Sequence, residues 1–123
     1  MNKVLIADDD FISLEVLKAM LGAYPIELYT ATNGQQAIQV AEQQHPALIL
    51  LDYDMPDMSG AEVCVALRQQ GFAQTPIVAI TGHQSATELN ACREAGMLAT
   101  LHKPVSPDAL DELLHKYLPQ AFS

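Results

Sequence analysis

The sequence has few cationic side chains, no tryptophan and few aromatic residues of any kind. Only six lysines and arginines stand against fifteen aspartates and glutamates in 123 residues, which gives a net charge of −9. Because a phosphate backbone needs cationic partners, we do not expect this chain to bind nucleic acid directly. A basic protein partner or a divalent cation suits this charge better, although acidity also serves solubility.

Long apolar runs are missing as well. No run approaches the roughly 18 residues that a membrane-spanning helix needs, and no basic segment precedes an apolar stretch near the start. We therefore expect a cytoplasmic chain that does not insert into a membrane. The two cysteines, Cys64 and Cys92, lie in apolar helical patterns without metal-ligand spacing. This placement favours free buried thiols over a disulfide.

The remaining composition is that of a globular protein, with 50% apolar and 17% charged residues. The length predicts one domain, residues 1–123, with a single substantial core. Four short apolar runs each stop at a polar side chain. Residues 4–7 are followed by Asp8, Asp9 and Asp10, and residues 47–51 are followed by Asp52. Residues 76–80 are followed by Thr81, and residues 98–102 are followed by Lys103.

Helical patterns alternate with these runs, and most begin with a capping residue. The starts are Asn33 with Gln36, Ser59 with Glu62, Ser85 with Glu88, and Ser106 before Pro107. Together with a half-exposed strand predicted at residues 26–31, these segments alternate strand and helix five times along the chain. It predicts an α/β fold, a doubly wound five-stranded parallel sheet with helices on both faces. Because residues 26–31 and 98–102 carry polar positions, they should be the edge strands, which gives the order 2-1-3-4-5.

In that order the first and third strands meet at the point where a parallel sheet binds ligands, and Asp8, Asp9 and Asp52 follow them. Carboxylates this close repel one another by several kcal/mol per pair at an effective dielectric constant near 20. A cation among them would offset that cost, and oxygen ligands favour Mg²⁺ over zinc. The simpler alternative, that the acids only cap the first helix, is the better interpretation for Asp10 alone.

Asp52 follows the most apolar run, so we expect its carboxylate to be fixed and partly desolvated. A carboxylate so placed beside a metal can act as a nucleophile toward a phosphoryl group. Lys103 could neutralise charge on the phosphoryl oxygens, and the Thr81 hydroxyl could donate to one of them.

Over essentially its full length the chain resembles a response-regulator receiver domain of two-component signalling. Asp8-Asp9 matches the metal-binding acids of that family, and Thr81-Gly82 and Lys103-Pro104 match two further signature positions. Residues 52–60, DYDMPDMSG, resemble the phosphorylation motif D-x-x-M-P-x-M-[DS]-G. The fold that the resemblance implies is the flavodoxin-like sheet predicted above.

The resemblance implies a phosphorelay function. Asp52 would receive a phosphoryl group from a phosphohistidine of a histidine kinase or a histidine phosphotransfer domain, with helix 1 facing that partner. It also implies Mg²⁺ held by Asp9, Asp52 and the backbone carbonyl of Asp54, with Asp8 acting through water. The domain would be a regulatory phosphoacceptor rather than an enzyme, although it would assist its own phosphorylation and dephosphorylation.

One position departs from the family pattern. Receivers usually carry tyrosine or phenylalanine three residues before the lysine, and Thr100 stands there instead. In receivers that ring swings inward when the threonine moves, so the aromatic half of the usual conformational switch is absent here. Asp54 and His83 occupy the positions two residues beyond Asp52 and Thr81, where family members vary and tune the phosphate lifetime.

Other functions remain open at this point. The Asp52-Tyr53-Asp54 segment also resembles the D-x-D motif of haloacid-dehalogenase-type phosphatases, although in that family the motif ends the first strand. The chain could also be a non-phosphorylated pseudo-receiver that only binds partners, or a scaffold of the same fold. Within the receiver interpretation, it is either a stand-alone regulator or a receiver from a hybrid sensor kinase.

Overall fold

The apolar runs form one parallel sheet, whose computed structural model describes residues 2–82 and 85–122. The strands are β1 (Asn2–Ala7), β2 (Ile26–Ala31), β3 (Leu48–Asp52), β4 (Ile77–Thr81) and β5 (Ala99–His102). Their order is β2-β1-β3-β4-β5, all parallel, as predicted. Every residue of β3 and β4 is buried, whereas the edge strands β2 and β5 are partly exposed.

Five helices connect or follow the strands. They are α1 (Phe11–Leu21), α2 (Gly34–Gln44), α3 (Gly60–Gln69), α4 (Ala86–Ala95) and α5 (Pro107–Tyr117), with a short 3₁₀ helix at Pro119–Phe122. Each of the five α-helices begins directly after a capping residue. The side chain of that residue accepts a hydrogen bond from a backbone N–H in the first turn of the helix, which would otherwise be unpaired. These capping residues are Asp10, Asn33, Ser59, Ser85 and Ser106.

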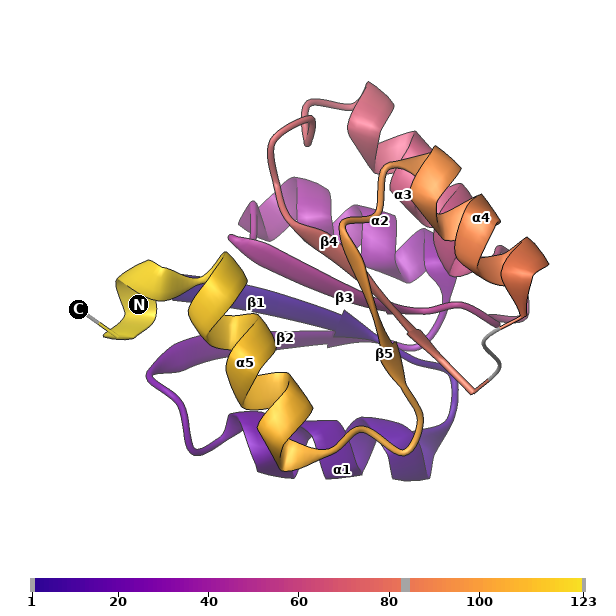
Figure 1. The fold of residues 1–123 in the computed structure, drawn as a ribbon. Helices are drawn as coiled ribbons and strands as arrows, with labels where there is room; N and C mark the ends of the chain where they lie inside the picture. Colours follow the sequence, from indigo (N-terminus) through magenta and orange to yellow (C-terminus); the bar gives the residue numbers. More distant parts are fainter. Residues whose placement is uncertain (1, 83–84, 123) are drawn as a thin grey trace.

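The helices cover both faces of the sheet (Figure 1). Helices α1 and α5 lie on one face, and α2, α3 and α4 lie on the other. Successive side chains of a strand point to opposite faces, so β1 serves both cores. Val4 and Ile6 pack toward α1 and α5, whereas Leu5 and Ala7 pack toward α2 and α3. Burial on both faces explains why these strands are apolar runs rather than alternating patterns.

Strand register brings the polar residues together. Ala7 pairs with Leu51, so Asp8 and Asp52 follow paired positions on neighbouring strands. Asp52 in turn pairs with Ile80, directly before Thr81. The four strand ends therefore reach the same edge of the sheet, as the sequence predicts.

The cysteine prediction is confirmed, because Cys64 and Cys92 are free and buried in the core between the sheet and α3 and α4. Across the described residues, the helices are too short or too polar for any of them to cross a membrane.

Candidate functional site

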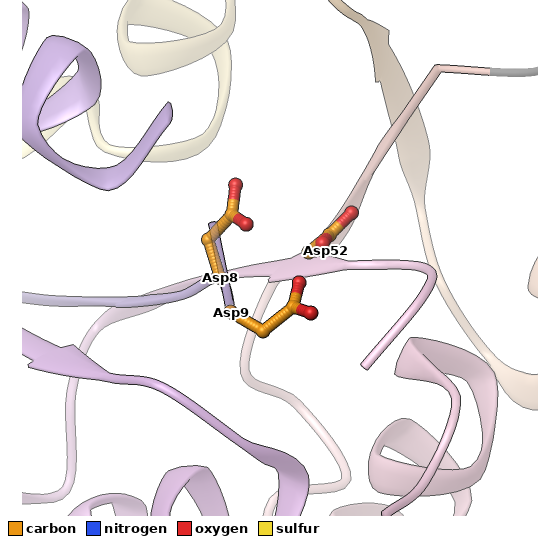
Figure 2. A group of neighbouring side chains, drawn as sticks. All are labelled: Asp8, Asp9 and Asp52. Carbon is orange, nitrogen blue, oxygen red and sulfur yellow. The ribbon is translucent and has the colours of Figure 1, made fainter. Parts of the chain in front are cut away.

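Three carboxylates gather at the carboxyl edge of the sheet (Figure 2). Asp8 and Asp9 come from the connection between β1 and α1, and Asp52 ends β3. One oxygen from each lies within 4.8 Å of the others. Asp8 is fully buried, Asp52 is 5% exposed and Asp9 is exposed to solvent. The crevice is therefore closed at its base and open on the Asp9 side.

The backbone fixes Asp8 in place. Its N–H donates to the carbonyl of Ala31 at 3.0 Å, and its Oδ1 accepts from the Asp10 N–H at 2.9 Å. Asp10 itself caps α1, because its carboxylate accepts from the Ile12 N–H at 3.2 Å and from the Ser13 hydroxyl at 2.9 Å. The interpretation of Asp10 as a cap rather than a member of the acidic cluster is confirmed.

The loop after β3 is held against Asp52 at close range. The Gly60 N–H donates to the Tyr53 carbonyl at 2.8 Å, and a Cβ atom at residue 60 would lie 2.6 Å from the Asp52 carbonyl oxygen. Only glycine allows α3 to begin so near the strand end. Farther along, Asp57 accepts from the backbone N–H groups of Gly34 and Gln35, at 2.8 and 2.9 Å, and so ties the loop to the start of α2.

Lys103 supplies the positive charge of the crevice. Its ammonium lies 3.1 Å from Asp8 Oδ2 and 3.3 Å from Asp52 Oδ1. The Lys103 N–H donates to the Thr81 carbonyl at 2.8 Å, and the peptide bond to Pro104 is cis. Asp8 Oδ2 is buried and, although it pairs with the ammonium, receives no hydrogen bond from the described residues. One ammonium thus pairs with two of the three carboxylates.

This arrangement shifts the proton affinities of Asp52 and Lys103. Burial, followed by the charge of Asp8, raises the pKa of Asp52 to about 7, although Lys103 opposes the shift. Burial also lowers the pKa of Lys103, but the two carboxylates outweigh it, and the net pKa of Lys103 is raised. Lys103 is therefore charged at neutral pH, and Asp52 is incompletely ionised without a further cation.

Thr81 ends β4, only 2% exposed. Its hydroxyl donates to Glu88 Oε2 in α4 at 3.2 Å. The sequence predicts that Glu88 closes a capping box with Ser85, and half of that box is present, since the Glu88 N–H donates to Ser85 Oγ at 3.2 Å. The role of the Glu88 carboxylate was missed, because no local pattern reveals a contact with the preceding strand.

Two other predicted positions, Asp54 and Thr100, lie outside the carboxylate cluster. The Asp54 side chain is exposed, and it does not belong to the carboxylate cluster found among the described residues. Thr100 lies in β5 beside a cavity of about 280 Å³ between α4 and β5. His83 lies outside the described residues. Asp57, which the sequence analysis did not single out, anchors the loop between β3 and α3.

Comparison with known proteins identifies the family. The model of the response regulator receiver domain matches residues 4–115. The chain is 34% identical to the signal transduction histidine-protein kinase BarA of Escherichia coli K12, over 94% of this chain but 13% of BarA. It is 28% identical to the polar-differentiation response regulator DivK of Brucella ovis, over 98% of both proteins. The chain thus spans about an eighth of the length of BarA and of the sensor histidine kinase RcsC, which it also matches.

Solved structures agree. The chemotaxis protein CheY4 of Vibrio cholerae superposes with a TM-score of 0.90 at 30% identity, covering 96% of this chain and 99% of CheY4. The receiver domain of the sensor histidine kinase PA1611 of Pseudomonas aeruginosa has a TM-score of 0.89 at 27% identity, covers 96% of this chain and 98% of its own, and was solved with magnesium coordinated in its active-site cleft. The chain belongs to the receiver domains, regulatory phosphoacceptor modules of phosphorelay signalling.

Proposed function

We propose that Asp52 is the phosphoacceptor and that residues 1–123 act as one receiver domain. The observation that carries this proposal is the position of the Asp52 carboxylate, 3.3 Å from Lys103 and within 4.8 Å of the other two acids. An Asp52 oxygen would attack the phosphorus of a partner's phosphohistidine as the P–N bond breaks. The bonding electrons leave with the imidazole, and Lys103 balances charge on the phosphoryl oxygens.

The acidic cluster suits a hard divalent cation, and we propose that this is Mg²⁺. All the gathered ligands are oxygens, and the buried Asp8 Oδ2 receives no hydrogen bond among the described residues, although it lies 3.1 Å from the Lys103 ammonium. Asp9, Asp52 and the Asp54 carbonyl would hold the ion, with Asp8 acting through water. When bound, the ion would supply positive charge to the phosphoryl oxygens and lower the repulsion among the acids. By stabilising these charges the domain would assist its own phosphorylation.

The proposed partner is a helix that carries the phosphohistidine. Helix α1 begins directly after the acids and exposes apolar side chains, with Phe11 72%, Ile12 71% and Val16 51% exposed. A mostly apolar cavity of about 380 Å³ lies between α1 and the residues after β5. Exposed apolar patches beside a site mark binding surfaces. The surface lies next to Lys103, so a docked helix would deliver its histidine to Asp52. Such a partner suits a stand-alone regulator and a hybrid kinase equally.

Phosphoryl uptake tests this proposal. The protein is incubated with acetyl phosphate and Mg²⁺, and the intact mass is measured for the wild type, Asp52→Asn and the surface control Asp108→Asn. We expect one phosphoryl adduct on the wild type and on Asp108→Asn, and none on Asp52→Asn. An adduct on Asp52→Asn would move the phosphoacceptor elsewhere, and a wild type without an adduct would support a pseudo-receiver. Sustained turnover of a small phosphate ester would instead favour the phosphatase alternative.

A further inference from the structure

Two helices of this chain begin with the same capping pattern but use its glutamate differently. At α3 the Glu62 carboxylate turns back and accepts from the Ser59 N–H at 3.0 Å, which closes the capping box. At α4 the Glu88 carboxylate accepts from the Thr81 hydroxyl at the end of β4. The capping of α4 therefore extends, through one side chain, to a residue at the edge of the phosphoacceptor site.

The Thr81 hydroxyl has a single proton to donate. While that proton is shared with Glu88, it is not available to an oxygen of a phosphoryl group on Asp52. Thr81 is buried, and Asp52 lies on the adjacent strand, paired with Ile80. A phosphoryl group on Asp52 and the Glu88 carboxylate are thus two anionic acceptors that compete for the same donor.

We infer that Glu88 is a positioning residue that holds the Thr81 hydroxyl toward α4 in the unphosphorylated protein and releases it on phosphorylation. The inference rests on the proposed function, because it takes Asp52 as the phosphoacceptor. Release of Glu88 frees the first turn of α4 from β4, so the state of Asp52 is transmitted directly to that helix. The Glu88 contact restrains the unphosphorylated state and lowers affinity for a phosphoryl group.

The surroundings of Thr100 favour this route. Thr100 lies beside the cavity between α4 and β5, whose other lining residues are Leu89, Cys92, Arg93, Met97, Leu98 and Ala99. This lining contains no aromatic ring that could move when Thr81 moves. The Thr81–Glu88 hydrogen bond instead joins the site directly to α4.

The test measures binding of beryllium fluoride, a phosphoryl mimic, in saturating Mg²⁺ by calorimetry. Four proteins form a double-mutant cycle: the wild type, Glu88→Ala, Thr81→Ala and the double variant. Glu94→Ala is the matched control, since Glu94 is an exposed acid on the same helix. Glu88→Gln keeps an acceptor at residue 88, and Glu88→Leu is a second variant without one. Unfolding midpoints establish that each variant is folded.

We expect Glu88→Ala and Glu88→Leu to bind beryllium fluoride about threefold to tenfold more tightly than the wild type. This is the effect expected when one competing hydrogen bond to a charged group is lost. Glu88→Gln should lie nearer the wild type, and Glu94→Ala should match it. In the Thr81→Ala background, replacing Glu88 should change nothing. Amide exchange in the first turn of α4 should change when the wild type binds the mimic, and should not change in Glu88→Ala.

Two results would overturn the inference while leaving the proposed function intact. One is equal affinity of Glu88→Ala and the wild type. The other is the same gain with and without the Thr81 hydroxyl, which would assign the effect to charge alone. If the wild type bound no mimic at all, the proposed function would fail, and the inference would fail with it.

Discussion

The carboxyl edge of the sheet has two halves, one after β1 and β3 and the other after β4 and β5. Different kinds of contact hold the side chains of each half in place. After β1 and β3, backbone N–H groups hold the Asp8 carboxylate and the loop, as in the bonds from Asp10 to Asp8 and from Gly34 to Asp57. After β4 and β5, the functional groups are held by other side chains. Thr81 contacts Glu88, and Lys103 contacts Asp8 and Asp52.

This difference separates what is preorganised from what can respond. A carboxylate held by backbone donors keeps its position whether or not a ligand is present, since the donors belong to helix starts and strand ends. A hydroxyl or an ammonium can rotate to a new acceptor at little cost to the fold. The β1–β3 half thus offers fixed positions for the proposed metal ion and phosphoryl group, and the β4–β5 half holds the groups that could respond to them.

The largest expected effect comes from removing the charge that joins the two halves. We predict that Lys103→Met lowers the free energy of unfolding by about 2–4 kcal/mol, because it leaves buried carboxylates without a partner. Urea unfolding without divalent cations measures this loss. Lys18→Met is the matched control, since Lys18 pairs with Glu15 on the surface at 3.1 Å and such pairs contribute about 0–1 kcal/mol. Equal losses in the two variants would contradict the buried-pair argument.

The second prediction concerns pH. The pKa of Asp52 is raised from its ordinary value of 3.8 to about 7. The folded state therefore binds this proton more tightly than the unfolded chain. The resulting stability is complete below about pH 4 and is lost as the pH rises through about 7. Asp52→Asn should accordingly be more stable than the wild type at pH 8 by about 1–3 kcal/mol, with a smaller difference at pH 5.

Urea unfolding at the two pH values, with a chelator present, measures this difference. Asp108→Asn controls for loss of a surface carboxylate and should show no such pH-dependent gain. A wild type that is as stable as Asp52→Asn at pH 8 would mean that Lys103 fully compensates the buried acids. The carboxylates of the β1–β3 half would then not destabilise the folded protein by repelling one another.

The third prediction tests the same repulsion with a cation. Mg²⁺ at ten times its dissociation constant should stabilise the wild type by about 1.4 kcal/mol, because it binds the folded state alone. Asp9→Asn should fold normally, since Asp9 is exposed, but should lose most of this gain. Thermal unfolding with and without Mg²⁺ provides the measurement, and a gain that survives in Asp9→Asn would place the ion elsewhere.

The fold was predictable because local signals agree with the tertiary structure. Capping residues set the helix starts, and the polar positions of residues 26–31 and 98–102 identified β2 and β5 as the edges. The acidic cluster was predictable too, since each acid follows an apolar run. Asp57 and Glu88 were not, because their partners lie across the fold. Glu88 shows the reason: its local pattern predicts a capping box, and a hydroxyl brought near by folding takes the carboxylate instead.

A smaller effect is expected at Asp57, which anchors the fixed half. Asp57→Ala removes the acceptor of two backbone N–H groups at the start of α2. These bonds lower the pKa of Asp57, so their stabilisation is present at neutral pH and is lost as the pH falls. The variant should lower the urea midpoint at pH 7 by less than Lys103→Met does, and should weaken Mg²⁺ binding by loosening the Asp54 carbonyl. Unchanged Mg²⁺ affinity would show that the loop holds its position without this tie.

The smallest effect is expected at Asp54, whose exposed side chain belongs to the fixed loop but not to the carboxylate cluster. We predict that Asp54→Ala slows loss of the phosphoryl group about threefold, because residue 54 lies two positions beyond Asp52 and its exposed carboxylate would accept from an attacking water. Decay of the phosphorylated protein after removal of acetyl phosphate gives the rate. Asp54→Asn keeps an acceptor and should decay more nearly like the wild type. Because the backbone, not this side chain, is proposed to bind the metal, Mg²⁺ affinity should be unchanged in both variants. A rate equal to that of the wild type would mean that groups of the β4–β5 half, rather than Asp54, set the lifetime of the phosphoryl group.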